Sequence, residues 1–340
     1  MGWRISPINC FNSDPASVIW LLANRGFSGQ ASDRTLFPTS AKPGASGNFK
    51  KDLLMKYYHV DVFSKKKFSG NGLTVFIGDK DLEKSTMQTL TQEMRQFESI
   101  FFYPVNSNTF RAFIFTMEEE LDFAGHPVLG VAAIIHDLYS KEKEKNNWTI
   151  ELNARPVLVR TIKKDNYYSV QMNQGRPEFG VILNKQQEQE FLSYFNLALE
   201  DKYLSLPFQV VTTGLPYLIL PIKAEALSKV KVVVPDLEKK LKSIGAKFFY
   251  ALDIENRQGR TWDNLGLVED IATGSAAGPV GAYLVKNGFE KIDNEIILRQ
   301  GDFLGRPSEL KIRVSGVNDE IDDVYVEGDV CKVAIGELLS

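Results

Sequence analysis

The chain has 340 residues, of which 44% are hydrophobic and 24% charged, and its formal net charge is −3. This length is enough for two ordinary domains, and the composition is that of a globular protein with a sizeable core. The slightly negative balance gives no electrostatic basis for binding nucleic acid or an anionic membrane surface. We therefore expect neither kind of partner.

Two cysteines, Cys10 and Cys331, are too few for a disulfide framework or a Cys-rich metal site. With three histidines in the chain, an ordinary zinc site would need mostly carboxylate ligands, so we expect no metal. The longest apolar run near the start, residues 18–23, is shorter than the core of about 7–15 residues in a signal peptide. No window approaches the roughly 18 apolar residues of a membrane span. We expect a protein of the reducing cytoplasm.

Residues 1–54 differ from the rest of the chain. They mix Ser, Pro, Gly and Asn with scattered aromatic residues and show no sustained hydrophobic period. We interpret them as a leader, a cloning artefact or an over-long start that is disordered or non-native; a genuine N-terminal extension is the alternative. Met55 then opens a strand-like run through Phe63.

From Met55 onward the sequence alternates between strand and helix patterns. Short segments rich in β-branched and aromatic residues are typical of strands. The expected strands, after the first, are Leu73–Ile77, Ile100–Tyr103, Phe110–Thr116, Trp148–Leu152, Tyr167–Met172, Phe208–Thr212, Tyr217–Leu220, Phe248–Asp253, Glu295–Arg299, Leu310–Val314, Val324–Val326 and Cys331–Ile335.

One surface helix is predicted over 85–97, with Ser85 as N-cap and Gln88 completing a capping box. A more charged helix is predicted over 239–243 and is ended by Gly245. The apolar face of the first helix repeats at spacings of three and four. It consists of Met87, Leu90, Met94 and Phe97.

Two further helices, Pro127–Leu138 and Ala276–Val285, are apolar or small on nearly every side. Such helices are normally buried. We expect each to run through the middle of a curved sheet rather than along a surface.

The segments that precede these two helices resemble each other, which indicates a duplicated domain. Each has an Asp, an Ala two residues later and a Gly after six more, and a weaker echo lies upstream at Gly72-Leu73 and Gly214-Leu215. The matching pairs are Asp122 with Asp270, Ala124 with Ala272, and Gly130 with Gly278.

Gly125-His126 and Gly274-Ser275 stand where these two helices begin. A helix N-terminus has unpaired N–H groups and a partial positive charge, and glycine lets a ligand approach the backbone. The pair suits a carboxylate or a phosphate. The alternative is a purely structural turn into a core helix.

Several stretches in order resemble the PhzF-like family of phenazine biosynthesis, from about Met55 to the end; residues 1–54 have no counterpart. The two longest, residues 123–130 and 269–278, are the most specific. The stretches are Val60-Asp-Val-Phe63, Phe68-Ser-Gly-Asn71, Glu98-Ser99, Phe123-Ala-Gly-His-Pro-Val-Leu-Gly130, Thr213-Gly-Leu-Pro-Tyr217, Glu269-Asp-Ile-Ala-Thr-Gly-Ser-Ala-Ala-Gly278, Gln300-Gly and Gly305-Arg-Pro-Ser308.

The resemblance implies a diaminopimelate-epimerase-like α/β (α+β) fold. Two similar domains would each wrap a curved mixed sheet around a central buried helix, with the active site in the cleft between them. We expect the first domain at 55–165, completed by C-terminal strands at about 323–340, and the second at 166–322. The resemblance also implies a homodimer without a cofactor that moves a proton on a small carboxylated metabolite, such as a cyclic amino acid related to dihydro-hydroxyanthranilate.

Carried over by position, Glu98 matches the family's proton-shuttling carboxylate, and His126 and Asp270 match catalytic polar residues. The implied substrate-binding residues are Asn71, Gly125, Thr273, Gly274 and Ser275. Related epimerases of this fold use one thiol at each helix start. Here those places hold Gly125-His126 and Gly274-Ser275, which excludes a two-thiol mechanism.

The chemistry fits Glu98 on physical grounds. If it ends the predicted helix, the negative end of the helix dipole raises its pKa, and its apolar neighbours act in the same direction by desolvation. A raised pKa suits a carboxylate that both gives and takes a proton near neutrality. A solvated Glu at a helix end is the structural alternative. Capping is the structural alternative for His126 and Asp270.

Other functions remain open at this point. A catalytically silent metabolite-binding protein would keep the same fold without turnover. A hydrolase or lyase is less favoured, since the chain has no Gly-x-Ser-x-Gly elbow and no phosphate loop of the Gly-Lys-Thr type. Gly72, Ile271 and Trp262-Asp-Asn264 depart from the family's common Pro-containing pattern and place the substrate's identity in doubt.

Overall fold

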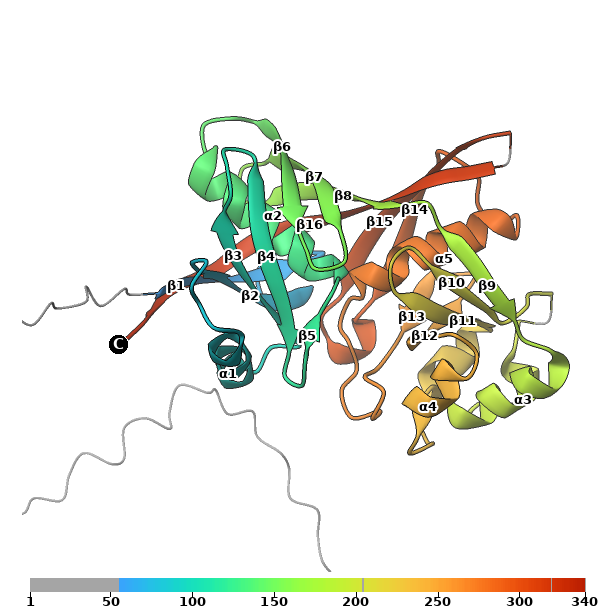
Figure 1. Cartoon of the computed structure of the whole chain (residues 1–340). Coiled ribbons are helices and arrows are strands. Elements are labelled where there is room, and N and C mark those ends of the chain that lie inside the picture. The colour runs from blue at the N-terminus through green and yellow to red at the C-terminus, as the bar shows by residue number, and fades with distance from the viewer. Residues whose placement is uncertain (1–54, 204, 319, 340) are drawn as a thin grey trace, which may run out of the picture. The chain divides into compact units, whose positions relative to one another are not determined.

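The computed structural model describes residues 55–203, 205–318 and 320–339. Residues 52–340 form one compact unit, a mixed α/β structure that is rich in strands and has few helices (Figure 1). The strands of the described ranges join into one 16-stranded sheet. The predicted leader lies outside the described residues.

The first half of the unit is a ring of strands. Its sheet runs in the order β1, β2, β3, β4, β6, β7, β8 and β16, and β1 also pairs with β16, which closes the ring. Its strands are β1 (Met55–Val62), β2 (Asn71–Ile77), β3 (Glu98–Pro104), β4 (Thr109–Thr116), β5 (Glu120–Leu121), β6 (Lys145–Glu151), β7 (Pro156–Lys163) and β8 (Tyr168–Gly175), with β16 (Glu320–Leu338) from the end of the chain.

The second half continues the same sheet from β16 through β15 to β9. β16 is shared by both halves because it pairs with β1, β8 and β15. The further strands are β9 (Glu178–Ile182), β10 (Gln209–Thr212), β11 (Pro216–Ile222), β12 (Phe248–Asp253), β13 (Gln258–Arg260), β14 (Glu295–Gln300) and β15 (Ser308–Val317).

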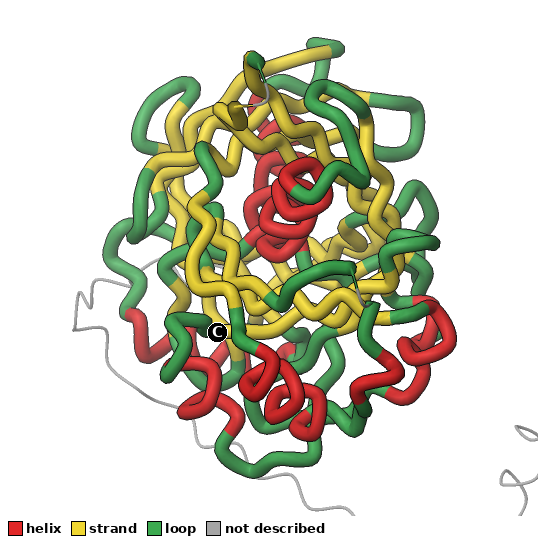
Figure 2. Tube along the Cα trace, turned by 90° about the vertical axis from the view of Figure 1, so that its right-hand side faces the viewer, coloured by secondary structure: helices red, strands yellow, loops and turns green. Residues whose placement is uncertain are grey.

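Two long helices, α2 (Gly125–Tyr139) and α5 (Gly274–Lys286), are buried over most of their length. α2 contacts β1, β2, β3, β6, β7, β8 and β16, whereas α5 contacts β10, β11, β15 and β16. Figure 2 shows a central helical region, in red, with strands, in yellow, around it. The burial predicted from their small and apolar composition is confirmed, and the two helices also contact each other.

The remaining helices cover the outside. α1 (Lys84–Met94) packs Met87 against Phe76, Phe101 and Phe115 in a small separate core. α3 (Lys185–Tyr194), α4 (Leu237–Lys242) and the short 3₁₀ helices Leu199–Asp201 and Ala224–Lys229 lie in the second half, and a third 3₁₀ turn spans Asp302–Leu304. In each half, two parallel strands flank a helical connection: β2–α1–β3 in one and β11–α4–β12 in the other. This agrees with the duplication inferred from the sequence.

The helix expected over 85–97 differs from the structure at both ends. Ser85 is not its N-cap, because the helix begins at Lys84 after Glu83 and no side chain caps it. The helix ends at Met94, where Arg95 takes a left-handed conformation with φ 53°. Glu98 is therefore the first residue of β3 rather than a helix end.

Several other predictions were incomplete. β7, β9, β13 and α3 were not predicted. The strands expected at 324–326 and 331–335 are parts of the single strand β16, and the helix expected at 239–243 spans Leu237–Lys242. The two domain boundaries stay a prediction, because the sheet continues from one half into the other.

Candidate active site

The two similar helix starts meet in space. A Cβ atom placed on Gly125 would lie 2.4 Å from the backbone carbon of Gly274 and from the amide nitrogen of Ser275. A Cβ atom on Gly274 would lie 3.0 Å from the amide nitrogen of His126. Glycine is thus required for this close approach. Two helix N-termini, each with unpaired amide groups and a positive dipole end, converge on one place.

Glu98 and His126 form the side of the site that belongs to the first half. Glu98 begins β3, opposite Thr116 of β4, and His126 stands in the first turn of α2. Their side chains are buried, with 3.4 Å between Glu98 Oε2 and His126 Nδ1. Neither Glu98 Oε2 nor His126 Nε2 has a hydrogen-bond partner among the described residues.

The electrostatics of this pair favour its neutral form. Burial, followed by the nearby charge of Asp270, raises the pKa of Glu98 well above its usual range. Burial lowers the pKa of His126 to about 3. The contact is therefore a neutral acid facing a neutral imidazole and not an ion pair. The predicted rise in the pKa of Glu98 and its predicted cause by desolvation are confirmed, with the charge of Asp270 as a further cause. The predicted contribution of a helix dipole was wrong, because Glu98 begins a strand.

Asp270, Asn71 and Thr273 form a bonded group on the opposite side. Asn71 Nδ2 donates to Asp270 Oδ1 at 2.8 Å and to the carbonyl of Ala272 at 2.9 Å. Thr273 Oγ1 donates to the other carboxylate oxygen, Asp270 Oδ2, at 2.6 Å. Burial raises the pKa of Asp270, while the bonds from Thr273 and Asn71 oppose that rise.

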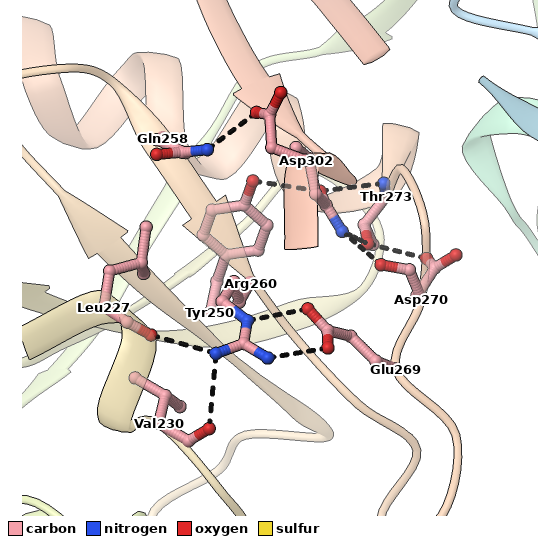
Figure 3. A network of polar contacts seen from close by, with 10 residues as sticks. Leu227, Val230, Tyr250, Gln258, Arg260, Glu269, Asp270, Thr273 and Asp302 are labelled. Carbon is pink, nitrogen blue, oxygen red and sulfur yellow. Dashed lines mark hydrogen bonds and ion pairs between the residues drawn. The ribbon is translucent and has the colours of Figure 1, made fainter. Parts of the chain in front are cut away.

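The residue before Asp270 has a separate partner. Glu269 accepts both forked hydrogen bonds of Arg260, each at 2.7 Å, and Arg260 also donates to the carbonyl of Leu227 (Figure 3). The guanidinium stacks on Trp262 at 4.5 Å and on Phe303 at 4.3 Å from the ring centroids. The charge of Glu269 is therefore balanced by that of Arg260. The carboxylate whose charge acts on Glu98 is Asp270.

Two buried side chains hold the start of α5. Tyr217 OH lies 2.7 Å from Ser275 Oγ, and Gln174 Nε2 donates to the carbonyl of Gly274 at 2.9 Å. Tyr217, Gln174 and also Gln300 were not among the predicted site residues. Tyr217 and Gln300 do lie in the quoted family stretches, which is the signal that pointed to them; Gln174, at the end of β8, follows no such stretch.

A cavity of about 920 Å³ opens over these groups. It continues outward past Lys239, Lys247 and Trp262. The structure brings all eight sequence-predicted site residues to its wall, although their roles stay a proposal. These residues are Asn71, Glu98, Gly125, His126, Asp270, Thr273, Gly274 and Ser275.

Other chemistries find little support in the described part of the chain. Cys331 is buried on β16 and does not line the cavity, and Cys10 lies outside the described residues. Across 55–203, 205–318 and 320–339, no cluster of three or more His, Cys, Asp or Glu has the arrangement of a metal site. None of the helices in these ranges is both long and apolar enough to cross a membrane.

Known proteins resemble this chain in sequence and in fold. The family described as phenazine biosynthesis-like protein matches residues 60–336. The trans-2,3-dihydro-3-hydroxyanthranilate isomerase of Pseudomonas aeruginosa is 28% identical over 289 residues, which cover 83% of this chain and 98% of that protein. The solved structure of a predicted epimerase from the same organism is 46% identical, with a TM-score of 0.80 over 84% of this chain and 99% of that one.

A more distant structure shows how far the fold extends. The hydroxyproline epimerase of Agrobacterium vitis is 13% identical and has a TM-score of 0.58, over 85% of this chain and 93% of that one. At that identity the likeness concerns the fold alone. The match over residues 60–336, together with relatives named as isomerases and epimerases, leads to one conclusion. The chain belongs to the PhzC/PhzF family of phenazine biosynthesis-like proteins.

Proposed function

We propose that this protein is a cofactor-independent isomerase that moves a proton on a small, carboxylated, cyclic amino-acid-like metabolite, with Glu98 as its acid and base. One observation carries the proposal. Glu98 is a buried carboxyl group that faces a cavity, with one oxygen that has no hydrogen-bond partner in the described structure. Buried polar groups nearly always have such a partner, and a catalytic role is one of the reasons for which a protein keeps one unsatisfied.

The proposed reaction needs one group that gives a proton and takes another. The Glu98 carboxyl donates its proton to one carbon of an unsaturated ring, and the π electrons of that double bond form the new C–H bond. The resulting carboxylate removes a proton from a second carbon, and the electrons of that C–H bond form the new double bond. Glu98 ends the cycle protonated, as it began. Its raised pKa favours the protonated carboxyl group that the first step requires.

The other site residues orient the substrate in this proposal. The converging amides at Gly125 and Gly274 suit the substrate's carboxylate. Asp270, which already accepts hydrogen bonds on both oxygens, suits an amine or ammonium group. His126 lies beside Glu98 as a neutral ring, 3.4 Å from its Oε2. A fold with two like halves places these groups on facing walls, and we also propose that the protein works as a homodimer.

The test is hydrogen exchange with solvent. We expect wild-type protein in D₂O to incorporate deuterium into trans-2,3-dihydro-3-hydroxyanthranilate, the compound named for the Pseudomonas aeruginosa relative. Glu98→Gln should lower that rate by about 10²-fold or more, because a positioned acid–base contributes roughly 10²–10⁴-fold. Mass spectrometry measures the exchange, and calorimetry measures binding, which should be nearly unchanged.

Glu93→Gln is the matched control. It makes the same change five residues earlier on the exposed surface of α1, and we expect wild-type exchange. Full exchange in Glu98→Gln would refute the role of Glu98. Tight binding by wild-type protein without any exchange would instead support the catalytically silent metabolite-binding protein.

A further inference from the structure

Gln300, at the end of β14, is fully buried beside the site, and its side-chain amide makes four hydrogen bonds. Its Oε1 accepts from Tyr250 OH at 3.0 Å and from the Thr273 backbone N–H at 3.1 Å. Its Nε2 donates to the Asp270 carbonyl at 2.8 Å and to Thr273 Oγ1 at 2.9 Å. Two donors face the amide oxygen and two acceptors face the amide nitrogen. The hydrogen bonds therefore determine the orientation of the amide.

The direction of the amide determines the direction of the next bond. Thr273 Oγ1 already receives a hydrogen from Gln300. Its own single hydrogen is then free to go to Asp270 Oδ2, 2.6 Å away. Figure 3 shows Tyr250, Thr273 and Asp270 joined in this network. Since a hydroxyl has only one hydrogen, Gln300 makes Thr273 a donor toward the carboxylate.

Asp270 therefore meets donors on both oxygens. Asn71 Nδ2 donates to Oδ1 and Thr273 Oγ1 donates to Oδ2. A protonated Asp270 would point its own hydrogen at one of these donors, whereas an ionised carboxylate only accepts. On the first side, Glu98 Oε2 has no donor among the described residues and faces His126 Nδ1 at 3.4 Å.

We propose that Gln300 is a positioning residue: through Thr273 it favours the ionised form of Asp270 against the effect of burial, and the charge of Asp270 in turn keeps the proton on Glu98. The inference deepens the proposed function and rests on it, because a protonated Glu98 is the acid of that reaction. Gln300 does not itself line the cavity; it bonds Asp270 and Thr273, which do.

The other titratable groups near Glu98 and Asp270 carry no free charge that would compete with this effect. His126 stays neutral, because its pKa is lowered to about 3. Burial raises the pKa of Tyr217 and of Tyr250, so both phenols also stay neutral. Glu269 is paired with Arg260. Asp270 in turn is one of the causes that raise the pKa of Glu98, after burial.

The test is a titration of both carboxyl groups in the full chain, without substrate. Side-chain ¹³C NMR of Asp- and Glu-labelled protein reports each group, with Glu98→Gln and Asp270→Asn used for assignment. In Gln300→Met, which keeps the length but not the amide, Thr273 can turn its hydrogen away. We expect the pKa of Asp270 to rise and that of Glu98 to fall, changing the proton's distribution about tenfold, or one pKa unit.

Gln174→Met is the matched control. Gln174 is another buried glutamine near the start of α5, but it bonds the Gly274 carbonyl and Thr213 and not the Asp270 group. It should destabilise the fold by a similar amount and leave the Glu98 titration in place. An equal shift in both variants would overturn the proposal, since it would reflect general loosening of the site.

A second pair of variants carries the test if Gln300→Met does not fold. Thr273→Ser keeps the hydroxyl and should keep the wild-type titration, whereas Thr273→Val should reproduce the shift. An unchanged Glu98 titration in a folded Gln300→Met or Thr273→Val protein would refute the role of Gln300. The titration is measured without turnover. An unchanged titration therefore refutes the role of Gln300, whereas continued exchange in Glu98→Gln refutes the proposed function.

Discussion

The starts of α2 and α5 share a glycine, a buried setting and one cavity, but they differ in how their polar groups are satisfied. At the α2 start, Glu98 Oε2 and His126 Nε2 have no partner in the described structure. At the α5 start, Asp270 and Ser275 are hydrogen-bonded to protein groups. Since unmet buried polar atoms are uncommon, the contrast agrees with the proposal that Glu98 reacts and that Asp270 orients the substrate.

The contrast also shows what duplication preserves. Both halves have a glycine at the start of a buried helix, because the two helix starts lie too close together for a side chain. The side chains around these glycines have diverged in function. A site that handles an asymmetric substrate needs unequal walls, and the structure supplies them through Glu98 on one half and Asp270 on the other.

We expect the largest effect from adding a methyl group where the starts of α2 and α5 touch. Gly125→Ala would place a methyl group 2.4 Å from backbone atoms of Gly274 and Ser275, and overpacking of this kind costs about 3 kcal/mol or more. Gly274→Ala first meets the end of the Phe63 ring at 2.9 Å, so a smaller loss of about 1–3 kcal/mol is expected. Thermal unfolding and soluble yield measure both.

Gly78→Ala is the control for that pair, because its new methyl group has ordinary contacts at 3.6 Å or more. It should change stability by no more than about 0.5 kcal/mol. A Gly125→Ala protein as stable as the control would mean that the two helix starts do not touch, and the comparison between them would lose its basis.

The next prediction concerns how the stability of the folded protein depends on pH through Glu98. The folded-state pKa of Glu98 lies well above 4.5, so the folded protein keeps this proton after the unfolded chain has released it. Stability from this group is therefore present at low pH and is lost as pH rises from about 4.5 through the folded pKa, by up to about 1.4 kcal/mol per pH unit. Glu98→Gln removes this loss and should be more stable than wild type above that window.

Asp270→Asn should lower stability, although burial raises the pKa of Asp270 as it does that of Glu98. Its amide NH₂ would face a donor, Asn71 or Thr273, where a carboxylate oxygen now accepts. The unmatched bond should cost about 1–3 kcal/mol. Urea unfolding at pH 5 and pH 8 measures both variants; stabilisation by Asp270→Asn as well would show that the second side is no better satisfied than the first.

The smallest effect concerns the bond between Ser275 and Tyr217. Ser275→Ala and Tyr217→Phe each leave one buried hydroxyl without its partner at 2.7 Å, which should cost about 1 kcal/mol per variant. The double variant removes both hydroxyls and should cost less than the two single costs together. Additive costs in this double-mutant cycle would show that the two hydroxyls do not interact.

Local patterns in the sequence predicted much of the fold. They also contained signals for two elements that were not predicted, β7 and α3. β7 alternates buried Val157, Val159 and Thr161 with exposed residues, which is an ordinary strand pattern. α3 begins with a capping box of Asn184 and Gln187 that was also present in the sequence. The capping box assigned to Ser85 was wrong, because the N-cap is Glu83, two residues earlier, and Ser85 lies inside the helix.

Other features had no local signal. β16 is a single long strand because β1, β8 and β15 all pair with it, and those partners come from three distant parts of the chain. The position of Glu98 was misassigned for a similar reason, since β3 begins there by pairing with β2 and β4. Such pairings depend on contacts between segments that are remote in sequence.

By itself, the sequence determined the small and apolar character of the two buried helices, the glycines at their starts and the lack of thiols there. These are properties of the residues and of their immediate neighbours. Only the tertiary structure decided that Glu98 lies beside His126 and within reach of the charge of Asp270, and that Gln300 and Tyr217 support the opposite wall. The physical reason is that burial, hydrogen bonding and the interaction of charges depend on distances in space, which the order of residues along the chain does not contain.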